Sequence, residues 1–214
     1  MIQKFKNILG RIRYGTLFEA IQYRLEPIGI SVSPYYWIQE GLNDDATSEF
    51  QRKFEGYSFE FFGMDELKSI VESKAWKYSE EQLVSWLKDG KKCFGAKFQG
   101  QIAAFMWIDL AESNCKWYRF PLKDNEAYLF DMYTMKPFRG KGIAPYLRYQ
   151  SYKVLKDMGR DKCYSYSDFF NRPSIEFKKK LDAKCLKVGL YIELLKKYGW
   201  NWIIRDCRNG TDLR

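Results

Sequence analysis

The stretch Arg139-Gly140-Lys141-Gly142-Ile143-Ala144 has residue types and spacing suited to binding a phosphate group. An apolar run over residues 128–135 predicts a strand before it, and a periodic segment predicts a helix beginning near Ile143. The first backbone N–H groups of a helix have no partner within the helix, and the helix dipole adds partial positive charge there. A glycine-rich turn between a strand and a helix therefore predicts an anion-binding cradle.

The spacing within this stretch narrows the choice of ligand. A P-loop needs Ser or Thr after its Gly-Lys pair, but here Gly142 follows Lys141. A dinucleotide-binding fingerprint needs a third glycine where Pro145 stands. The remaining pattern, R-x-x-G-x-A, is formed by Arg139, Gly142 and Ala144. It resembles the pyrophosphate-binding signature of the GNAT superfamily of acyl-CoA N-acyltransferases.

The composition excludes several kinds of chemistry. None of the 214 residues is histidine, so His-ligated metals and imidazole base catalysis are excluded, and we expect no metal. A general base must be a carboxylate, Tyr, Lys, Cys or a relayed water. The five cysteines are widely separated, which favours reduced thiols. With no apolar stretch long enough to span a bilayer and no secretory signal, the expected location is cytoplasmic.

Residues 1–55 are expected to form an N-terminal extension. Apolar residues at helical spacing between Ile2 and Ile12, flanked by Lys and Arg, predict a basic amphipathic helix. This helix either packs on its own domain or on a second subunit in a homodimer, or it contacts an anionic membrane surface through residues 1–20. The net charge of +9 fits an anionic partner of any kind, and nucleic acid is the less favoured one.

Residues 56–214 are expected to form one acyl-CoA-binding domain. Their patterns predict strands at 57–62, 92–98, 101–109, 128–135, 163–167, 184–195 and 200–206, and helices at 64–73, 79–88, 142–158 and 173–181. This order resembles that of the GNAT fold, so the resemblance covers about residues 57–206. It implies an α+β fold with a central mixed, mostly antiparallel twisted sheet flanked by helices.

A second motif begins at Asn171 and ends at Leu181. Asn171, Ser174, Lys180 and Leu181 match the pattern of GNAT enzymes, in which an Asn opens the loop before an amphipathic helix. Many relatives place a Tyr that protonates the departing CoA thiolate where this chain has Lys178. Read without the family, Asn171 caps a helix, and Lys178 to Lys180 form a solvated face.

The resemblance implies where acetyl-CoA, or another acyl-CoA, binds as co-substrate. Its pyrophosphate would contact the backbone of the first motif, and its pantetheine arm would run beside residues 132–134. The expected cofactor-binding residues are Met132, Tyr133, Thr134, Arg139, Gly140, Lys141, Gly142, Ile143, Ala144, Asn171, Ser174 and Lys178.

The candidates for proton transfer lie on or near the same strand. Asp131 and Glu126 are the main candidate bases, with Asp168 beyond the next strand, and Tyr133 and Tyr166 offer hydroxyl groups. Asp131 stands out because aspartate is depleted in strands, and a bulge there would make side-chain alternation unreliable.

These features predict transfer of an acetyl or other short acyl group to a primary amine, by direct attack through a tetrahedral intermediate. The acceptor would be a small molecule, and the basic charge suits an anionic one such as a nucleotide-linked amino sugar. Two alternatives are a basic peripheral protein that binds a membrane or nucleic acid, and a GNAT-like module that binds CoA without catalysis.

Overall fold

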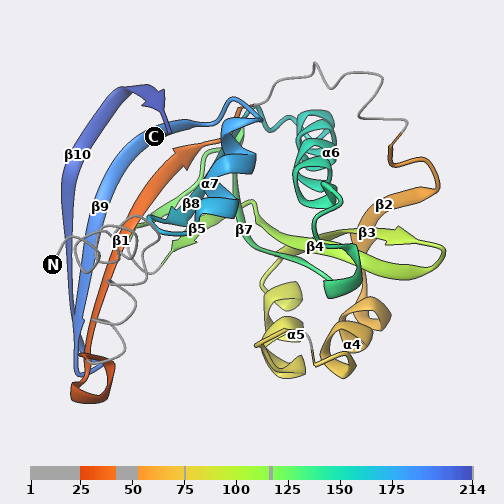
Figure 1. Ribbon diagram of the computed structural model, residues 1–214, viewed down its shortest axis with the longest axis horizontal. Coiled ribbons are helices and arrows are strands. Elements are labelled where there is room, and N and C mark those ends of the chain that lie inside the picture. The colour runs from red at the N-terminus through yellow and green to blue at the C-terminus, as the bar shows by residue number, and fades with distance from the viewer. Residues whose placement is uncertain (1–24, 42–52, 75, 116–117, 214) are drawn as a thin grey trace, which may run out of the picture.

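The computed structural model describes residues 25–41, 53–74, 76–115 and 118–213 (Figure 1). The amphipathic helix expected within residues 1–20 lies outside these ranges. The elements, in order, are η1 (Glu26–Ile28), β1 (Ile30–Gln39), β2 (Tyr57–Phe62), α4 (Met64–Glu72), α5 (Glu80–Lys88), β3 (Lys92–Phe98), β4 (Gln101–Asp109), β5 (Glu112–Cys115), β6 (Tyr118–Pro121), β7 (Glu126–Thr134), η2 (Lys136–Phe138), α6 (Ile143–Asp157), β8 (Lys162–Asp168), α7 (Arg172–Lys179), β9 (Lys184–Leu194) and β10 (Tyr198–Asp212). Within the described ranges, no helix is long and apolar enough to cross a membrane.

Eight of the strands form one twisted sheet in the order β10-β9-β1-β8-β7-β4-β3-β2. β7 and β8 are parallel, and the other neighbouring strands are antiparallel. The mixed, mostly antiparallel sheet expected from the sequence is therefore confirmed. A separate two-stranded ribbon, β5–β6, lies in a segment where the sequence patterns predicted no strand.

Helices cover both faces of the half of the sheet that contains β3, β4 and β7 (Figure 1). α6 packs on one face, where Leu147 and Leu155 meet Ala104 and Leu129. α4 and α5 pack on the other, where Leu67 and Leu83 lie in a cluster with Phe105 and Trp107. Burial of these aliphatic and aromatic side chains is the main term that holds the layers together.

The strand β1 falls within the segment that we expected to be an extension. It lies in the interior of the sheet, paired with β8 on one side and β9 on the other. Tyr35, Trp37 and Ile38 are almost completely buried. Pro34 stands within this strand, opposite Leu190 of β9. Because proline cannot donate to a ladder and is rare in central strands, its presence hid β1 from sequence reasoning.

Candidate functional site

A β-bulge at Asp131 interrupts the central strand β7. Phe105 of β4 lies opposite Tyr133, but Trp107 lies opposite Phe130, so Asp131 and Met132 together face one residue of β4. Asp131 has a φ of 44°, a left-handed conformation that Asp tolerates better than most residues. The extra residue shifts the alternation of side chains by one. As a result, Met132 packs on the α6 side and Tyr133 on the α4–α5 side.

The strands β7 and β8 separate just before this bulge. They pair only from Glu126 opposite Lys162 to Tyr128 opposite Tyr164. Beyond that point, β8 continues in its pairing with β1, and β7 in its pairing with β4. A cavity of about 590 Å³ opens between the separated strands, bounded by α6 and α7. Its volume falls within the range of about 300–1,000 Å³ that is usual for ligand sites.

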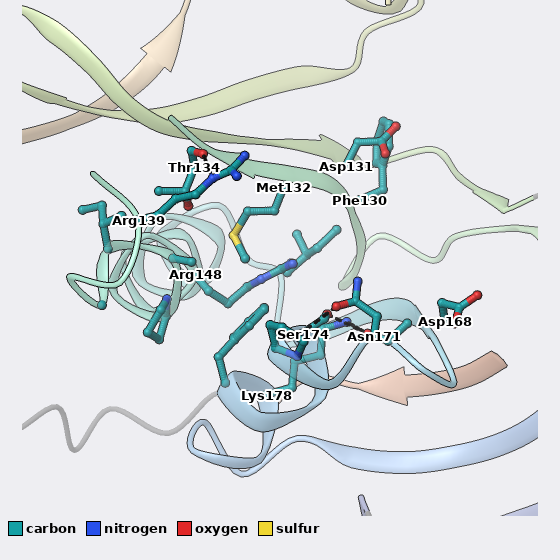
Figure 2. Close-up of a pocket in the computed structure, with 18 of the residues that line it drawn as sticks. Phe130, Asp131, Met132, Thr134, Arg139, Arg148, Asp168, Asn171, Ser174 and Lys178 are labelled. Atoms are coloured by element: carbon teal, nitrogen blue, oxygen red, sulfur yellow. Dashed lines mark hydrogen bonds between the residues drawn. The ribbon is translucent and has the colours of Figure 1, made fainter. Parts of the chain in front are cut away.

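Both sequence motifs meet in this cavity. The expected site residues that line it are Asp131, Met132, Thr134, Arg139, Gly140, Gly142, Ile143, Ala144, Asn171, Ser174 and Lys178, and Asp168 and Tyr166 join them. Figure 2 shows Met132 directed into the cavity from β7 and Asp131 directed to the opposite side of the strand. The bulge thus directs Met132 to the face of β7 that lines this cavity and the Asp131 carboxylate to the opposite face.

Three expected site residues, Glu126, Tyr133 and Lys141, do not line this cavity. Glu126 begins β7, and its carboxylate accepts hydrogen bonds from Lys123 N (3.0 Å) and Tyr164 Oη (3.2 Å). Tyr133 is turned away by the bulge, and Lys141 is exposed, with its Nζ 5.4 Å from the centre of the Phe138 ring. The structure therefore gives Asp131 a position at the cavity that it does not give Glu126.

The first turn of α6 faces the cavity with its backbone N–H groups. Gly142 is its N-cap, with φ of 83°, and no described side chain caps it. A Cβ added there would enter the space beside Lys53 Nζ and Phe54 Cζ, 3.6 and 3.8 Å away. Arg139 braces the approach to this turn, because its Nε donates to Thr134 O at 3.0 Å. A helix N-terminus open to a cavity is an anion-binding geometry.

Arg148 adds a second set of donors that the sequence did not reveal. It lies on α6, is only 3% exposed and lines the cavity (Figure 2). Among the described residues, its Nε and Nη1 have no hydrogen-bond partner. Buried guanidinium nitrogens are costly to leave unpaired, so they fit a ligand that brings oxygen acceptors. The sequence signal that could have revealed Arg148 is the presence of a charged residue among the positions of α6 that face the interior.

The alternative interpretation, in which Lys178 is part of a solvated face, is wrong for this residue. It is 1% exposed, and its Nζ donates to Ser165 Oγ (2.6 Å), Tyr166 O (3.0 Å) and Ser167 Oγ (3.0 Å). Ile175, three residues earlier on the same helix face, is buried too, which explains why Lys178 points inward. Burial lowers the pKa of Lys178 to about 8, although Glu40 acts in the opposite direction.

Glu40 is the buried carboxylate that accompanies these two cations. Its Oε1 lies 3.6 Å from Lys178 Nζ and 3.8 Å from Arg148 Nη1. Ser165 Oγ and Tyr152 Oη also donate to it. Burial alone would raise the pKa of Glu40, but the two cations and the two hydroxyls outweigh it and hold the pKa below its ordinary value. The cluster fixes α6, α7, β1 and β8 around one side of the cavity.

Asn171 caps α7, as the sequence predicted. Its Oδ1 accepts a hydrogen bond from Ser174 N at 3.2 Å. Ser174 Oγ lies 2.9 Å from Ser167 Oγ, which links the start of α7 to the end of β8. Asp168 turns the chain between these two elements, because its Oδ1 accepts from Phe170 N at 2.9 Å.

Asp131 accepts a hydrogen bond from Tyr78 Oη at its Oδ2, at 2.8 Å. Burial raises the pKa of Asp131, and the Tyr78 hydrogen bond and the nearby Lys77 partly oppose that rise. A carboxylate with a raised pKa is a better proton acceptor than an exposed one.

Comparisons with known proteins agree with this geometry. Residues 45–182 match the model of the Acetyltransferase (GNAT) family. Similar solved structures include an acetyltransferase from the GNAT family of Colwellia psychrerythraea (14% identity, TM-score 0.55, 82% of this chain and 61% of that chain). Others are a functionally unknown conserved protein of Staphylococcus epidermidis (8%, 0.55, 82% and 66%) and a Drosophila protein (10%, 0.54, 86% and 59%).

At these identities the solved structures show a shared fold and no more, and this chain spans less than two thirds of the length of each. A search of curated proteins found no match. The family model, in contrast, covers more than half of the chain, from just after β1 to the end of α7. The protein therefore belongs to the GNAT family of acetyltransferases.

Proposed function

We propose that this protein transfers an acetyl or other short acyl group from acyl-CoA to a primary amine of a small molecule. The observation that carries the proposal is the cavity between the separated strands β7 and β8, into which the N-terminus of α6 opens without a cap from any described side chain. The family match supports acyl transfer in general, and the acceptor is this proposal's own step.

The donors around the cavity fit acyl-CoA. The first turn of α6, with Gly140 and Gly142, would hold the pyrophosphate. The Arg148 nitrogens that have no hydrogen-bond partner among the described residues offer further donors deeper in the cavity. The edge of β7 over residues 132–134, which β8 does not pair, would bind the pantetheine amides as a neighbouring strand would. When bound, acyl-CoA supplies a thioester carbonyl that is activated toward an amine.

Asp131 is the residue that we assign to proton transfer. In the overall reaction, the amine nitrogen bonds to the acyl carbon and the C–S bond breaks. The alkylammonium gives up two protons, of which one ends on the CoA thiol and one is released. Asp131 lies at the boundary of the cavity, and its raised pKa suits it to accept the proton that the amine must lose before it can attack.

Lys178 has a positioning role in this proposal. An ammonium group has three N–H donors, and protein oxygens accept from all three of them. The group therefore anchors α7 to β8 and has no donor left for a departing thiolate, unlike the Tyr of many relatives.

The binding test compares two tryptophan substitutions by calorimetry with acetyl-CoA. Gly142→Trp places an indole in the cradle, whereas Gly90→Trp places one at a glycine of nearly equal φ, 82°, with open space around its Cβ. Both variants carry the same backbone strain, so a difference reports the cradle alone. We expect micromolar binding in wild type and Gly90→Trp and none in Gly142→Trp; equal binding in both variants would contradict the proposed cradle.

Turnover separates the enzyme from a module that only binds CoA. Release of CoA thiol is followed with a panel of primary amines, in wild type and in Asp131→Asn. Acetyl-CoA binding without release for any amine would favour the non-catalytic alternative. A homodimer, and contact of residues 1–20 with a membrane surface, stay predictions that concern segments outside the described ranges.

A further inference from the structure

A second, smaller cavity lies on the other side of β7 from the main one. Its volume is about 140 Å³. Five aromatic residues line it, together with Asn114, Cys115 and Asp131; the aromatic ones are Tyr78, Trp86, Tyr128, Phe130 and Tyr166. Asp131 is the only lining residue, among those that the structure describes, with a charge at neutral pH. A partly open cavity with several aromatic walls and one carboxylate is a chemical environment distinct from the first turn of α6.

The two cavities share part of their walls. Phe130, Asp131 and Tyr166 line both of them. Figure 2 shows Asp131 turned to the side of β7 opposite Met132, which faces the larger cavity. A group that binds the Asp131 carboxylate in the smaller cavity would therefore lie at the boundary with the larger one. This is where an acceptor nitrogen has to meet an acyl carbon.

The aromatic rings are arranged to favour a cation. Trp86 packs edge-on against Tyr78 and Phe130, with ring centres 4.8 and 5.3 Å apart, which holds the rings rigidly. Burial, reinforced by the Asp131 charge, raises the pKa of Tyr78 and of Tyr166, so both phenols stay neutral. Neutral aromatic faces attract ammonium groups and do not attract carboxylates.

The ring of Tyr78 already binds one cation. Lys77 Nζ lies 4.8 Å from its centre, yet Lys77 does not line the cavity. Lys77 also faces Asp131 closely enough to lower its pKa. Lys77 thus lies outside the cavity, and among the described residues no cation lines it, so an ammonium group from solution can approach Asp131 there.

We propose that the smaller cavity binds the amine end of the acceptor, as an alkylammonium on a short apolar or single-ring stem, with its nitrogen on Asp131. The proposal rests on the proposed acyl transfer and deepens it. An apolar cavity of about 150 Å³ admits one benzene ring, so a cavity of this volume takes one ring or a short chain. A negative group beside the amine would face the Asp131 carboxylate and is disfavoured, so any anionic part of the acceptor must lie further away.

Three ligands of nearly equal shape test the charge preference by calorimetry at neutral pH. Phenethylamine carries the ammonium, phenethyl alcohol is neutral, and hydrocinnamate is anionic. We expect phenethylamine to bind at least about tenfold more tightly than the alcohol, because a charge-assisted hydrogen bond to the carboxylate is stronger than a neutral one. Hydrocinnamate should bind most weakly. Equal affinities for the amine and the alcohol would overturn the proposal.

Three variants place the site. Asp131→Asn should remove the preference for the amine, and Asn tolerates the left-handed backbone at this position. Trp86→Leu should weaken the binding of both the amine and the alcohol. Trp200→Leu, at a half-exposed tryptophan on β10, is the matched control and should change neither. An unchanged preference in Asp131→Asn, together with unchanged binding in Trp86→Leu, would overturn the assignment to this cavity.

The same experiments separate this inference from the proposed function, because acetyl-CoA is titrated independently. Acetyl-CoA binding without any preference for the amine overturns the inference and leaves acyl transfer standing with another kind of acceptor. Amine binding that depends on Asp131, without acetyl-CoA binding, supports the ammonium site and contradicts the proposal that acetyl-CoA is the acyl donor. Loss of both would remove the inference together with the function on which it rests.

Discussion

Replacement of Glu40 by glutamine should destabilise this protein more than most single substitutions. Among the residues that the structure describes, Glu40 is the carboxylate that pairs with the buried cations Arg148 and Lys178, at 3.8 and 3.6 Å. Gln keeps the shape of the side chain but removes its charge, so two buried cations are left facing each other. Loss of one partner of a buried ion pair costs about 3–5 kcal/mol. Lys178 limits the cost, because its pKa is already lowered to about 8 and it can lose its proton.

Urea unfolding at neutral pH measures this effect, with Glu176→Gln as the matched control. Glu176 pairs with Lys179 at 2.9 Å on the exposed face of α7, and such exposed pairs contribute at most about 1 kcal/mol. We expect Glu40→Gln to lower the unfolding free energy by about 3 kcal/mol or more. Adding Lys178→Met to Glu40→Gln should recover part of the loss, because only one buried cation remains. A loss in Glu40→Gln no larger than in Glu176→Gln would refute the view that the cluster is a coupled ion network.

Three further predictions concern the cluster, the cradle and the bulge. The pKa of Lys178 is about 8 in the folded protein and 10.5 normally, so between these pH values the unfolded chain binds more protons than the folded one. The unfolding free energy of wild type should therefore rise by about 2 kcal/mol from about pH 7.5 to 9.5, and urea unfolding of Lys178→Met should show no such rise. Gly142→Ala should lower the unfolding free energy by about 1 kcal/mol, because its φ is 83°, while calorimetry should show acetyl-CoA binding retained; loss of binding would mean that the cradle tolerates no Cβ at all. Asp131→Val should be less stable than Asp131→Asn by about 1–2 kcal/mol in the same unfolding assay, because a β-branched residue fits φ of 44° poorly, and equal stability would argue against the bulge geometry.

Local signals in the sequence predicted most of the fold. The helix predicted at 79–88 is α5, and Ser79 caps it by accepting from Gln82 N. Gln99 and Gly100 both have positive φ, as a tight turn between β3 and β4 requires. Asn171 caps α7, and α6 begins at Ile143. Each of these features depends on residues within a few positions of one another, which is why a single sequence reveals them.

The features that escaped prediction all depend on long-range partners. β1 contains Pro34 and is recognisable as a strand only once β8 and β9 are present on either side. Lys178 belongs to a run of three lysines that is typical of a surface, and its ion-pair partner Glu40 lies far earlier in the chain, so the sequence gives no sign of the pair. Glu40 also precedes the segment that matches the family model, so no family pattern could point to it.

The smaller cavity was hidden for the same reason. Its aromatic lining comes from α5, from the segment before it, and from β7 and β8. In the sequence these residues look like ordinary core aromatics, and Tyr78 gives no sign that it donates to Asp131. Asp131 itself was recognisable, because an aspartate within an apolar strand needs a special environment.

The place of β1 in the sheet delays the pairing of this strand while the chain is made on the ribosome. β1 ends at Gln39, but its partners end at Asp168 and Leu194. At about 5–20 residues per second, synthesis of residues 40–194 takes roughly 8–30 s. During that time Tyr35, Trp37 and Ile38, which are buried in the finished sheet, have no strands to pair with. This topology therefore leaves an apolar strand exposed to aggregation during synthesis.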